Sequence, residues 1–156
     1  MTRKSEPRVA LFPGSFNPFT RGHESLVRRA LTFCDRVVIA VGVNIGKDPE
    51  DAERNCEAIR RVFTDDPNVD VTSYTGLTGD LAKRTEATFL LRGARNAADF
   101  EYERNMADAN RNLFGIETVI LPTLPELSWI SSSTARELSR FGHDPKELLP
   151  RTLSTN

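Results

Sequence analysis

The sequence has little charge bias, few cysteines and no long hydrophobic run. Its 156 residues carry a formal net charge of −1 with a pI near 6.1, so there is no long-range field to attract nucleic acid or an anionic membrane. The two cysteines, Cys34 and Cys56, lack Cys-x-x-Cys spacing, and no segment resembles a signal peptide or a membrane span. We therefore expect a cytoplasmic protein of one domain that binds neither nucleic acid nor membrane.

Short runs rich in β-branched and aromatic residues alternate with helical patterns along the chain. Five such runs predict buried strands, at residues 9–12, 37–43, 69–74, 88–91 and 118–121. Apolar residues at helical spacing separate the runs, for example Leu26, Ala30 and Phe33. This alternation predicts an α/β fold, namely a single-domain, doubly wound, five-stranded parallel sheet.

No linker, repeat or low-complexity segment divides the chain. We expect a flexible N-terminus at residues 1–7, one domain at residues 8–150 and a C-terminal tail at residues 151–156. Each unusual motif follows a predicted strand, at residues 13–23, 44–47, 77–80, 92–95 and 129–133. Because parallel strands deliver their loops to one edge of the sheet, these motifs are expected to form one site.

The segment from Pro13 to His23, Pro-Gly-Ser-Phe-Asn-Pro-Phe-Thr-Arg-Gly-His, has the pattern of a phosphate-binding loop. Its glycine lets phosphate approach the backbone, and the helix predicted to follow presents unpaired N–H groups. Thr20 is a candidate N-cap, and His23 in the first turn can turn a ring N–H toward a bound phosphate. The alternative is an ordinary turn in which His23 has a structural role.

A second segment, Leu-Arg-Gly-Ala-Arg-Asn-Ala-Ala-Asp-Phe-Glu-Tyr-Glu, places Arg92 and Arg95 on either side of a glycine. The forked donors of two guanidinium groups suit a phosphate clamp. The alternative is that both arginines pair with nearby carboxylates at Asp99, Glu101 and Glu103. The two interpretations are compatible.

A third segment, Trp-Ile-Ser-Ser-Ser-Thr-Ala-Arg-Glu, begins at Trp129 and opens a predicted helix. Thr134-x-x-Glu137 matches a capping box, and three adjacent serines exceed what capping needs, so they are candidates to seat the outer phosphates of a nucleotide. Lys47 is a candidate only through its position after a strand. The carboxylates at residues 48–53 are read as the start of a helix and not as a metal site.

Together the three segments resemble the bacterial phosphopantetheine adenylyltransferase family, within the Thr-x-x-His nucleotidyltransferases, over about residues 8–150. The first and third segments are shared by the wider superfamily, while Arg-Gly-x-Arg followed by Asp-Phe-Glu-Tyr-Glu looks specific to this family. The resemblance implies a Rossmann-like nucleotidyltransferase fold. It also implies transfer of the adenylyl group of ATP to 4′-phosphopantetheine, giving dephospho-coenzyme A and pyrophosphate. Magnesium, a homo-hexamer and coenzyme A as a possible feedback ligand are further implications.

The resemblance also assigns roles to individual residues. His23 would be catalytic. The residues implied to bind ATP are Ser15, Phe16, His23, Gly93, Ala94, Arg95, Glu103, Leu127, Ser128, Trp129, Ile130, Ser131, Ser132 and Ser133. Those implied to bind the acceptor are Ser15, Lys47, Leu77, Thr78, Arg92 and Asn110. No protein ligand for a metal is implied.

Two other functions remain open. A nicotinate or nicotinamide mononucleotide adenylyltransferase would share the first and third segments. A non-catalytic nucleotide-binding protein could have kept the fold, although the presence of His23, Lys47, Arg92 and Arg95 together argues against it.

Overall fold

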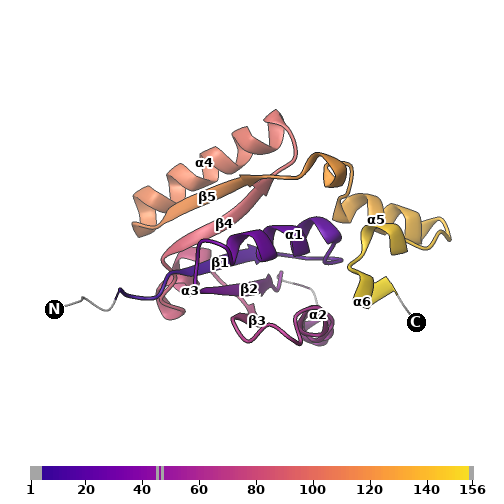
Figure 1. Cartoon of the computed structure of the whole chain (residues 1–156), viewed down its shortest axis with the longest axis horizontal. Helices are drawn as coiled ribbons and strands as arrows, with labels where there is room; N and C mark the ends of the chain where they lie inside the picture. Colours follow the sequence, from indigo (N-terminus) through magenta and orange to yellow (C-terminus); the bar gives the residue numbers. More distant parts are fainter. Residues whose placement is uncertain (1–4, 45, 47, 155–156) are drawn as a thin grey trace.

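Strands and helices alternate along the chain in the computed structural model, which describes residues 5–44, 46 and 48–154 (Figure 1). The strands are β1 Val9–Gly14, β2 Arg36–Gly42, β3 Val69–Tyr74, β4 Phe89–Ala94 and β5 Glu117–Pro122. The helices are α1 Arg21–Ala30, α2 Pro49–Val62, α3 Thr78–Arg84, α4 Ala97–Phe114, α5 Ser132–Arg140 and α6 Arg151–Ser154, with short 3-10 turns η1 Pro125–Leu127 and η2 Lys146–Leu148.

The five strands form one parallel sheet in the order β3-β2-β1-β4-β5. The direction of winding reverses between β1 and β4, and a crevice opens at such a point beyond the carboxyl ends of the strands. These two strands pair only at Ala10 with Phe89 and Leu11 with Leu90, so their last residues are free to diverge and to line a site.

Helices cover both faces of the sheet, as the doubly wound prediction requires. Alternate residues of β1 point to opposite sides: Ala10 and Phe12 join a buried cluster with residues of α1 and α2, such as Val27 and Ile59. Val9 and Leu11 belong to a second cluster, which includes Leu81 of α3. The predicted fold class is therefore confirmed.

Two predicted strands, β1 and β4, end more than one residue later than expected. β1 continues to Gly14, which pairs with Val41 of β2, and β4 continues to Ala94, which pairs with Pro122 of β5. Arg92 was predicted to begin a loop, but it lies within β4. The run of apolar residues in the sequence is shorter than the strand, because backbone hydrogen bonds to the neighbouring strand continue past the last buried side chain.

Of the two predicted helix caps, the one at Thr20 is confirmed and the one at Thr134 is not, while the predicted acidic helix start is found at α2. Thr20 caps α1 through a side chain that accepts from the N–H of His23, and Asp48 caps α2 ahead of acidic first-turn residues. The capping box predicted from Thr134 is wrong, because Ser131 is the N-cap of α5 and Thr134 supplies the N–H that it binds. A run of hydroxyl residues offers several possible caps, and only tertiary contacts select one.

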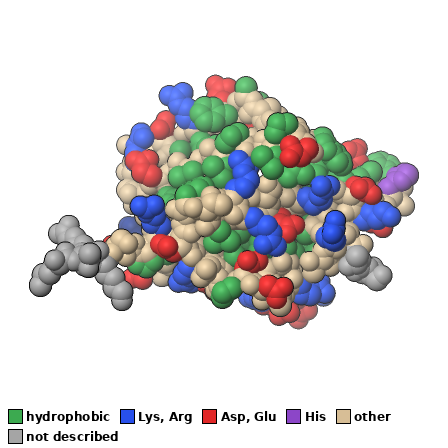
Figure 2. Space-filling model, viewed as in Figure 1, with side chains coloured by type: hydrophobic (Ala, Val, Ile, Leu, Met, Phe, Trp, Pro, Cys, Tyr) green, Lys and Arg blue, Asp and Glu red, His purple; other side chains and the backbone are tan. Residues whose placement is uncertain are grey.

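The apolar side chains of α4 are unusually exposed. Spacing along the sequence predicted this helix, yet Phe100, Tyr102, Met106 and Leu113 are 49%, 63%, 44% and 73% exposed. In Figure 2, hydrophobic side chains gather over the part of the molecule where Figure 1 draws α4 and β5.

Residues 151–154 form the short helix α6, and Leu153 packs against the cluster that contains Val27 and Ile59. Residues 151–154 therefore contact the domain, although the sequence predicted only a tail. Among the described residues, no helix combines the length and the apolarity that crossing a bilayer requires.

Candidate active site

Two adjoining cavities lie at the carboxyl ends of the strands, where β1 and β4 diverge. The first has a volume of about 360 Å³ and the second about 170 Å³. Pro13, Gly14 and Arg92 line both. The crevice predicted from strand order is therefore divided into two compartments that meet at one arginine.

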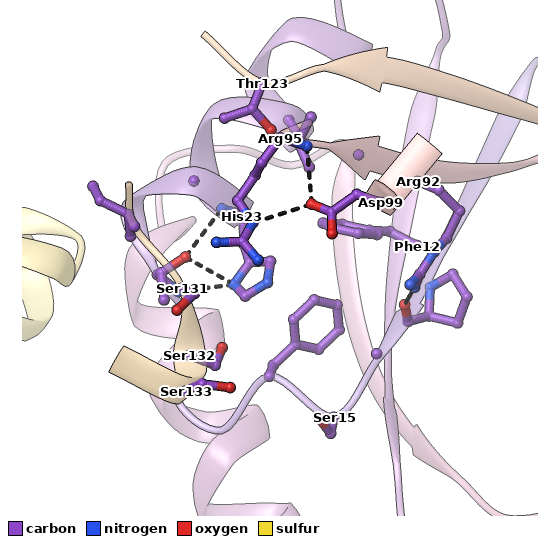
Figure 3. Close-up of a pocket in the computed structure, with 18 of the residues that line it drawn as sticks. Phe12, Ser15, His23, Arg92, Arg95, Asp99, Thr123, Ser131, Ser132 and Ser133 are labelled. Atoms are coloured by element: carbon purple, nitrogen blue, oxygen red, sulfur yellow. Dashed lines mark hydrogen bonds and ion pairs between the residues drawn. The ribbon is translucent and has the colours of Figure 1, made fainter. Parts of the chain in front are cut away.

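Two helix N-termini face the first cavity (Figure 3). Thr20, Gly22 and His23 come from the start of α1, and Ser131 to Ser133 come from the start of α5. The free N–H groups and the positive dipole end of each helix favour an anion. Because the two starts line one cavity, the compartment is suited to a group with more than one phosphate.

The ring of His23 is fixed by hydrogen bonds from Thr20. The backbone N–H of Thr20 donates to Nδ1 of His23 at 2.9 Å, and the Thr20 hydroxyl lies 3.1 Å from the same atom. A backbone N–H can only donate, so Nδ1 must be the acceptor and the neutral ring carries its proton on Nε2. His23 therefore has one N–H donor left for a ligand.

Phenylalanine rings surround the same histidine. Phe16 contacts it edge-on at 5.0 Å between ring centroids, Phe19 lies at 5.3 Å and Phe12 at 6.1 Å. Burial, followed by the positive charges of Arg92 and Arg95, lowers the pKa of His23 from 6.5 to about 4. The ring is consequently neutral at neutral pH and acts as a hydrogen-bond donor.

Each hydroxyl of the three-serine run has its own partner. Ser131 caps α5 by accepting from the N–H of Thr134 at 3.1 Å. Ser132 donates to the carbonyl of Pro18 at 2.8 Å and so ties α5 to the loop before α1. Ser133 accepts from Arg136 at 3.2 Å. Ser131 therefore caps the helix, Ser132 connects it to the loop before α1, and Ser133 pairs with Arg136 within α5 itself.

Arg92 is held rigidly at the boundary between the cavities. Its Nε and Nη2 donate to the carboxylate of Glu103 at 2.8 and 2.7 Å, and its Nη1 donates to the carbonyl of Pro13 at 2.5 Å. Burial opposes the charge of Arg92, but the hydrogen bonds and charge of Glu103 outweigh it, so the pKa of Arg92 is raised. A guanidinium has five N–H groups, so one on each terminal nitrogen is still unused by the described residues.

The first cavity contains two charged residues that the motifs did not single out as ligands. Asp99 accepts from both the backbone N–H and the Nε of Arg95, at 3.1 and 3.2 Å. Arg136 lines the cavity and donates to the carbonyl of Asn17 at 2.6 Å. The sequence did contain a signal for Arg136: it follows Ser132 by four residues, and residues at that spacing lie on the same face of a helix.

The second cavity combines aromatic and polar side chains. Tyr74, Tyr102 and Met106 line it beside Thr78 and Asn110. The hydroxyls of Tyr74 and Thr78 are 3.1 Å apart. An apolar wall with a few polar groups suits a flexible organic arm that carries amides better than it suits a polyphosphate.

The structure divides the predicted site residues into groups. Those that line the first cavity are Ser15, Phe16, His23, Gly93, Arg95, Ile130, Ser131, Ser132 and Ser133. Thr78, Glu103 and Asn110 line the second cavity, and Arg92 lines both. Leu77, Ala94, Leu127, Ser128 and Trp129 line neither, and Lys47 lies outside the described residues. What each of these residues binds stays a prediction.

Three of the predicted ATP ligands lie outside the first cavity and have other partners. Glu103 is 7% exposed and belongs to the second cavity as the partner of Arg92, and Asp99 pairs with Arg95, so the pairing with carboxylates offered as the alternative is confirmed for these two arginines. Leu127 is buried in a small cluster with Ile130. Trp129 is 55% exposed, and its indole N–H donates to the carbonyl of Glu126.

No cluster of three or more histidine, cysteine or acidic side chains with metal-binding geometry is present within residues 5–44, 46 and 48–154. The groups that surround the first cavity are mainly N–H and hydroxyl donors, which bind phosphate oxygens.

The low pKa of His23 predicts a loss of stability in acid. Between about pH 4 and 6.5 the unfolded histidine binds a proton and the folded one does not, so the free energy of unfolding falls as the pH falls through this range. From pH 7 to pH 5 the loss is about 2 kcal/mol. Urea unfolding at both pH values should show a smaller loss for His23→Asn than for the wild type.

The matched control is His143, which is the other histidine of the chain and is exposed. His143→Asn should keep the wild-type pH dependence. An equal loss of stability in the wild type and in His23→Asn would contradict the interpretation of His23.

Comparison with known proteins agrees with this geometry. A family model described as cytidylyltransferase-like matches residues 11–138. Among solved structures, a bifunctional NMN adenylyltransferase/ADP ribose pyrophosphatase from Francisella tularensis has a TM-score of 0.67 at 12% identity, over 92% of this chain and 44% of that one. At this identity the likeness establishes only a shared fold.

Curated relatives are much closer in sequence, and each is named phosphopantetheine adenylyltransferase. The protein of Phocaeicola vulgatus is 52% identical over 92% of this chain and 95% of its own length. That of Porphyromonas gingivalis ATCC 33277 is 51% identical over 91% and 94%, and that of Bacteroides thetaiotaomicron is 46% identical over 96% and 99%. With this identity along nearly the whole of both chains, the chain belongs to the phosphopantetheine adenylyltransferase family.

Proposed function

We propose that this protein transfers the adenylyl group of ATP to 4′-phosphopantetheine, giving dephospho-coenzyme A and pyrophosphate, a step of coenzyme A biosynthesis. Family membership supports the reaction. The observation that carries the proposal is that Arg92 lines two unlike cavities at once, one rich in anion-binding groups and one that combines aromatic and polar side chains. An enzyme that joins a nucleotide to a long organic phosphate needs such a pair of compartments.

In this proposal ATP occupies the first cavity. Its phosphates lie between the starts of α1 and α5, where N–H groups and the serine hydroxyls are available. Arg95 and Arg136 add positive charge. Ser15 and Phe16, on the loop between β1 and α1, also line this cavity and are proposed to contact the phosphates.

The acceptor occupies the second cavity, with its phosphate at Arg92. The two unused N–H groups of Arg92 form a fork that suits a phosphate, and Glu103 and Pro13 fix the direction of the fork. The pantetheine arm extends past Thr78 and Asn110, which can bind its amides. Lys47 is proposed to provide further charge.

The chemical step is a direct displacement. An oxygen of the acceptor phosphate forms a bond to the α-phosphorus of ATP, and the bond from that phosphorus to the oxygen bridging the α- and β-phosphates breaks as pyrophosphate leaves. The acceptor is already an anion near neutral pH, so no general base is required, and positioning and charge stabilisation account for the catalysis. The Nε2–H of neutral His23 donates to the charge that develops on the α-phosphate.

Magnesium enters this proposal as part of the ATP substrate. Mg²⁺ commonly binds through substrate phosphates, with several waters and few protein ligands. The donors at the first cavity are suited to phosphate oxygens, so the ion would be carried by the nucleotide.

Three finer features belong to the proposal. The exposed side chains of Tyr102, Met106 and Leu113 share one face of α4, and this apolar face supports assembly into a homo-hexamer. Coenzyme A contains both an adenylyl and a pantetheine part, so it could fill both cavities as a feedback ligand. The two buried cysteines are free thiols, which supports a cytoplasmic location.

Parallel acceptor assays test the reaction. With ATP and magnesium, pyrophosphate release should be at least about a hundredfold more efficient with 4′-phosphopantetheine than with nicotinate or nicotinamide mononucleotide. Faster turnover of a mononucleotide would assign the protein to the alternative reaction. Binding of ATP without pyrophosphate release from any of these acceptors would make it a non-catalytic nucleotide-binding protein.

His23→Ala should lower kcat by about a hundredfold or more while the dissociation constant of ATP changes little, because the hydrogen bond to the α-phosphate strengthens in the transition state. Arg92→Ala should instead raise KM for the acceptor. Steady-state kinetics with each substrate varied, together with ATP calorimetry, separate the two effects. Equal losses of ATP binding and turnover in His23→Ala would contradict the proposed role.

Charge introduced on the apolar face of α4 should break the assembly. Met106→Asp and Leu113→Asp, which lie two turns apart on the same face of α4, should each reduce the mass measured by light scattering, since a carboxylate buried without a partner is costly. Phe141→Asp is the matched control, because Phe141 is 69% exposed at the end of α5. An unchanged mass in both α4 variants would argue against this face as an interface.

A further inference from the structure

Asn55 of α2 reaches across to the loop that follows β1. Its side-chain amide nitrogen donates to the carbonyl of Phe16 at 2.7 Å and lies 3.2 Å from the carbonyl of Ser15. The amide has two N–H groups, so one side chain can serve two successive backbone carbonyls. Asn55 does not line either cavity, and none of the sequence motifs includes it.

The segment that Asn55 binds has an uncommon backbone conformation. Phe16 has a φ of 45°, in the left-handed region that a residue with a bulky side chain rarely adopts. Its ring turns back into the core, where it is 3% exposed and packs edge-on against Phe12 and His23. Such a conformation persists only when the surrounding contacts hold it.

The direction of these two carbonyls matters for an anion site. A carbonyl oxygen carries partial negative charge and would repel a phosphate. Because the C=O and N–H of a trans peptide point in opposite directions, turning the carbonyls of Ser15 and Phe16 toward α2 turns the N–H groups of Phe16 and Asn17 away from it. No described residue of α2 lines the first cavity, so this arrangement keeps the repelling oxygens on the outer side.

We infer that Asn55 is a positioning residue for nucleotide binding, which acts by holding the carbonyls of Ser15 and Phe16 away from the bound phosphates. Asn55 links α2 to the loop between β1 and α1, and it needs no contact with the substrate. The inference rests on the proposed function only in naming ATP as the nucleotide.

ATP calorimetry in the absence of acceptor tests this inference. Asn55→Ala should raise the dissociation constant of ATP about tenfold, as expected for the loss of two hydrogen bonds that order the loop. At saturating ATP, KM for 4′-phosphopantetheine should stay within about twofold of the wild type. Glu57→Ala is the matched control, because Glu57 is an exposed residue of the same helix, and its ATP affinity should be unchanged.

Two results would overturn the inference. One is an unchanged ATP dissociation constant in folded Asn55→Ala. The other is a reduced binding stoichiometry with unchanged affinity, which would mean that Asn55 only stabilises the fold. If Asn55→Ala does not fold, Asn55→Asp keeps the shape, removes both donors and is judged by the same two criteria. Because no acceptor is present, a failure of phosphopantetheine turnover would refute the proposed function without affecting this measurement.

Discussion

The hydrogen bond from the Thr20 backbone to the ring of His23 joins the fold to the chemistry of the site. It is half of a capping box in which histidine occupies the place that glutamate or glutamine usually takes. The same contact starts α1, directs its positive end at the first cavity and fixes the tautomer that leaves Nε2–H available. A glutamate at that position could cap the helix equally well, but it would place a negative charge beside the first cavity. Histidine caps the helix and leaves a neutral N–H donor there instead.

The ion pair between Arg92 and Glu103 makes a complementary contribution. Glu103 is 7% exposed and offsets the charge of Arg92, so the pair adds little net charge to the site. Its effect is geometric, since both partners lie on regular elements, β4 and α4, and the guanidinium fork is directed at the boundary between the cavities. The buried carboxylate would be strongly unfavourable without this arginine. The stability of the fold and the orientation of the donor group thus depend on one contact.

Much of the architecture could be predicted from local patterns. Five apolar runs marked the five strands, Thr20 was recognisable as a helix cap, and the carboxylates from Asp48 onward indicated the start of α2. The convergence of the motifs followed from the rule that parallel strands end at one edge, and His23, Arg92 and Arg95 do lie around one crevice. The capping box assigned to Thr134 failed because adjacent hydroxyl residues have nearly equal local preferences. Arg136 and Asn55 were not identified, since their partners at Asn17, Ser15 and Phe16 are far away in the sequence.

The sequence by itself determined the order of strands and helices along the chain, the position of the loop motifs after the strands and the family resemblance, because each depends on residues close together along the chain. Only the tertiary structure decided that Glu103 pairs with Arg92, that α4 leaves its apolar face exposed and that the crevice forms two compartments. These features depend on which distant side chains are brought within hydrogen-bonding or van der Waals distance. The packing of the helices on the sheet sets which side chains meet, and no local sequence pattern encodes that packing.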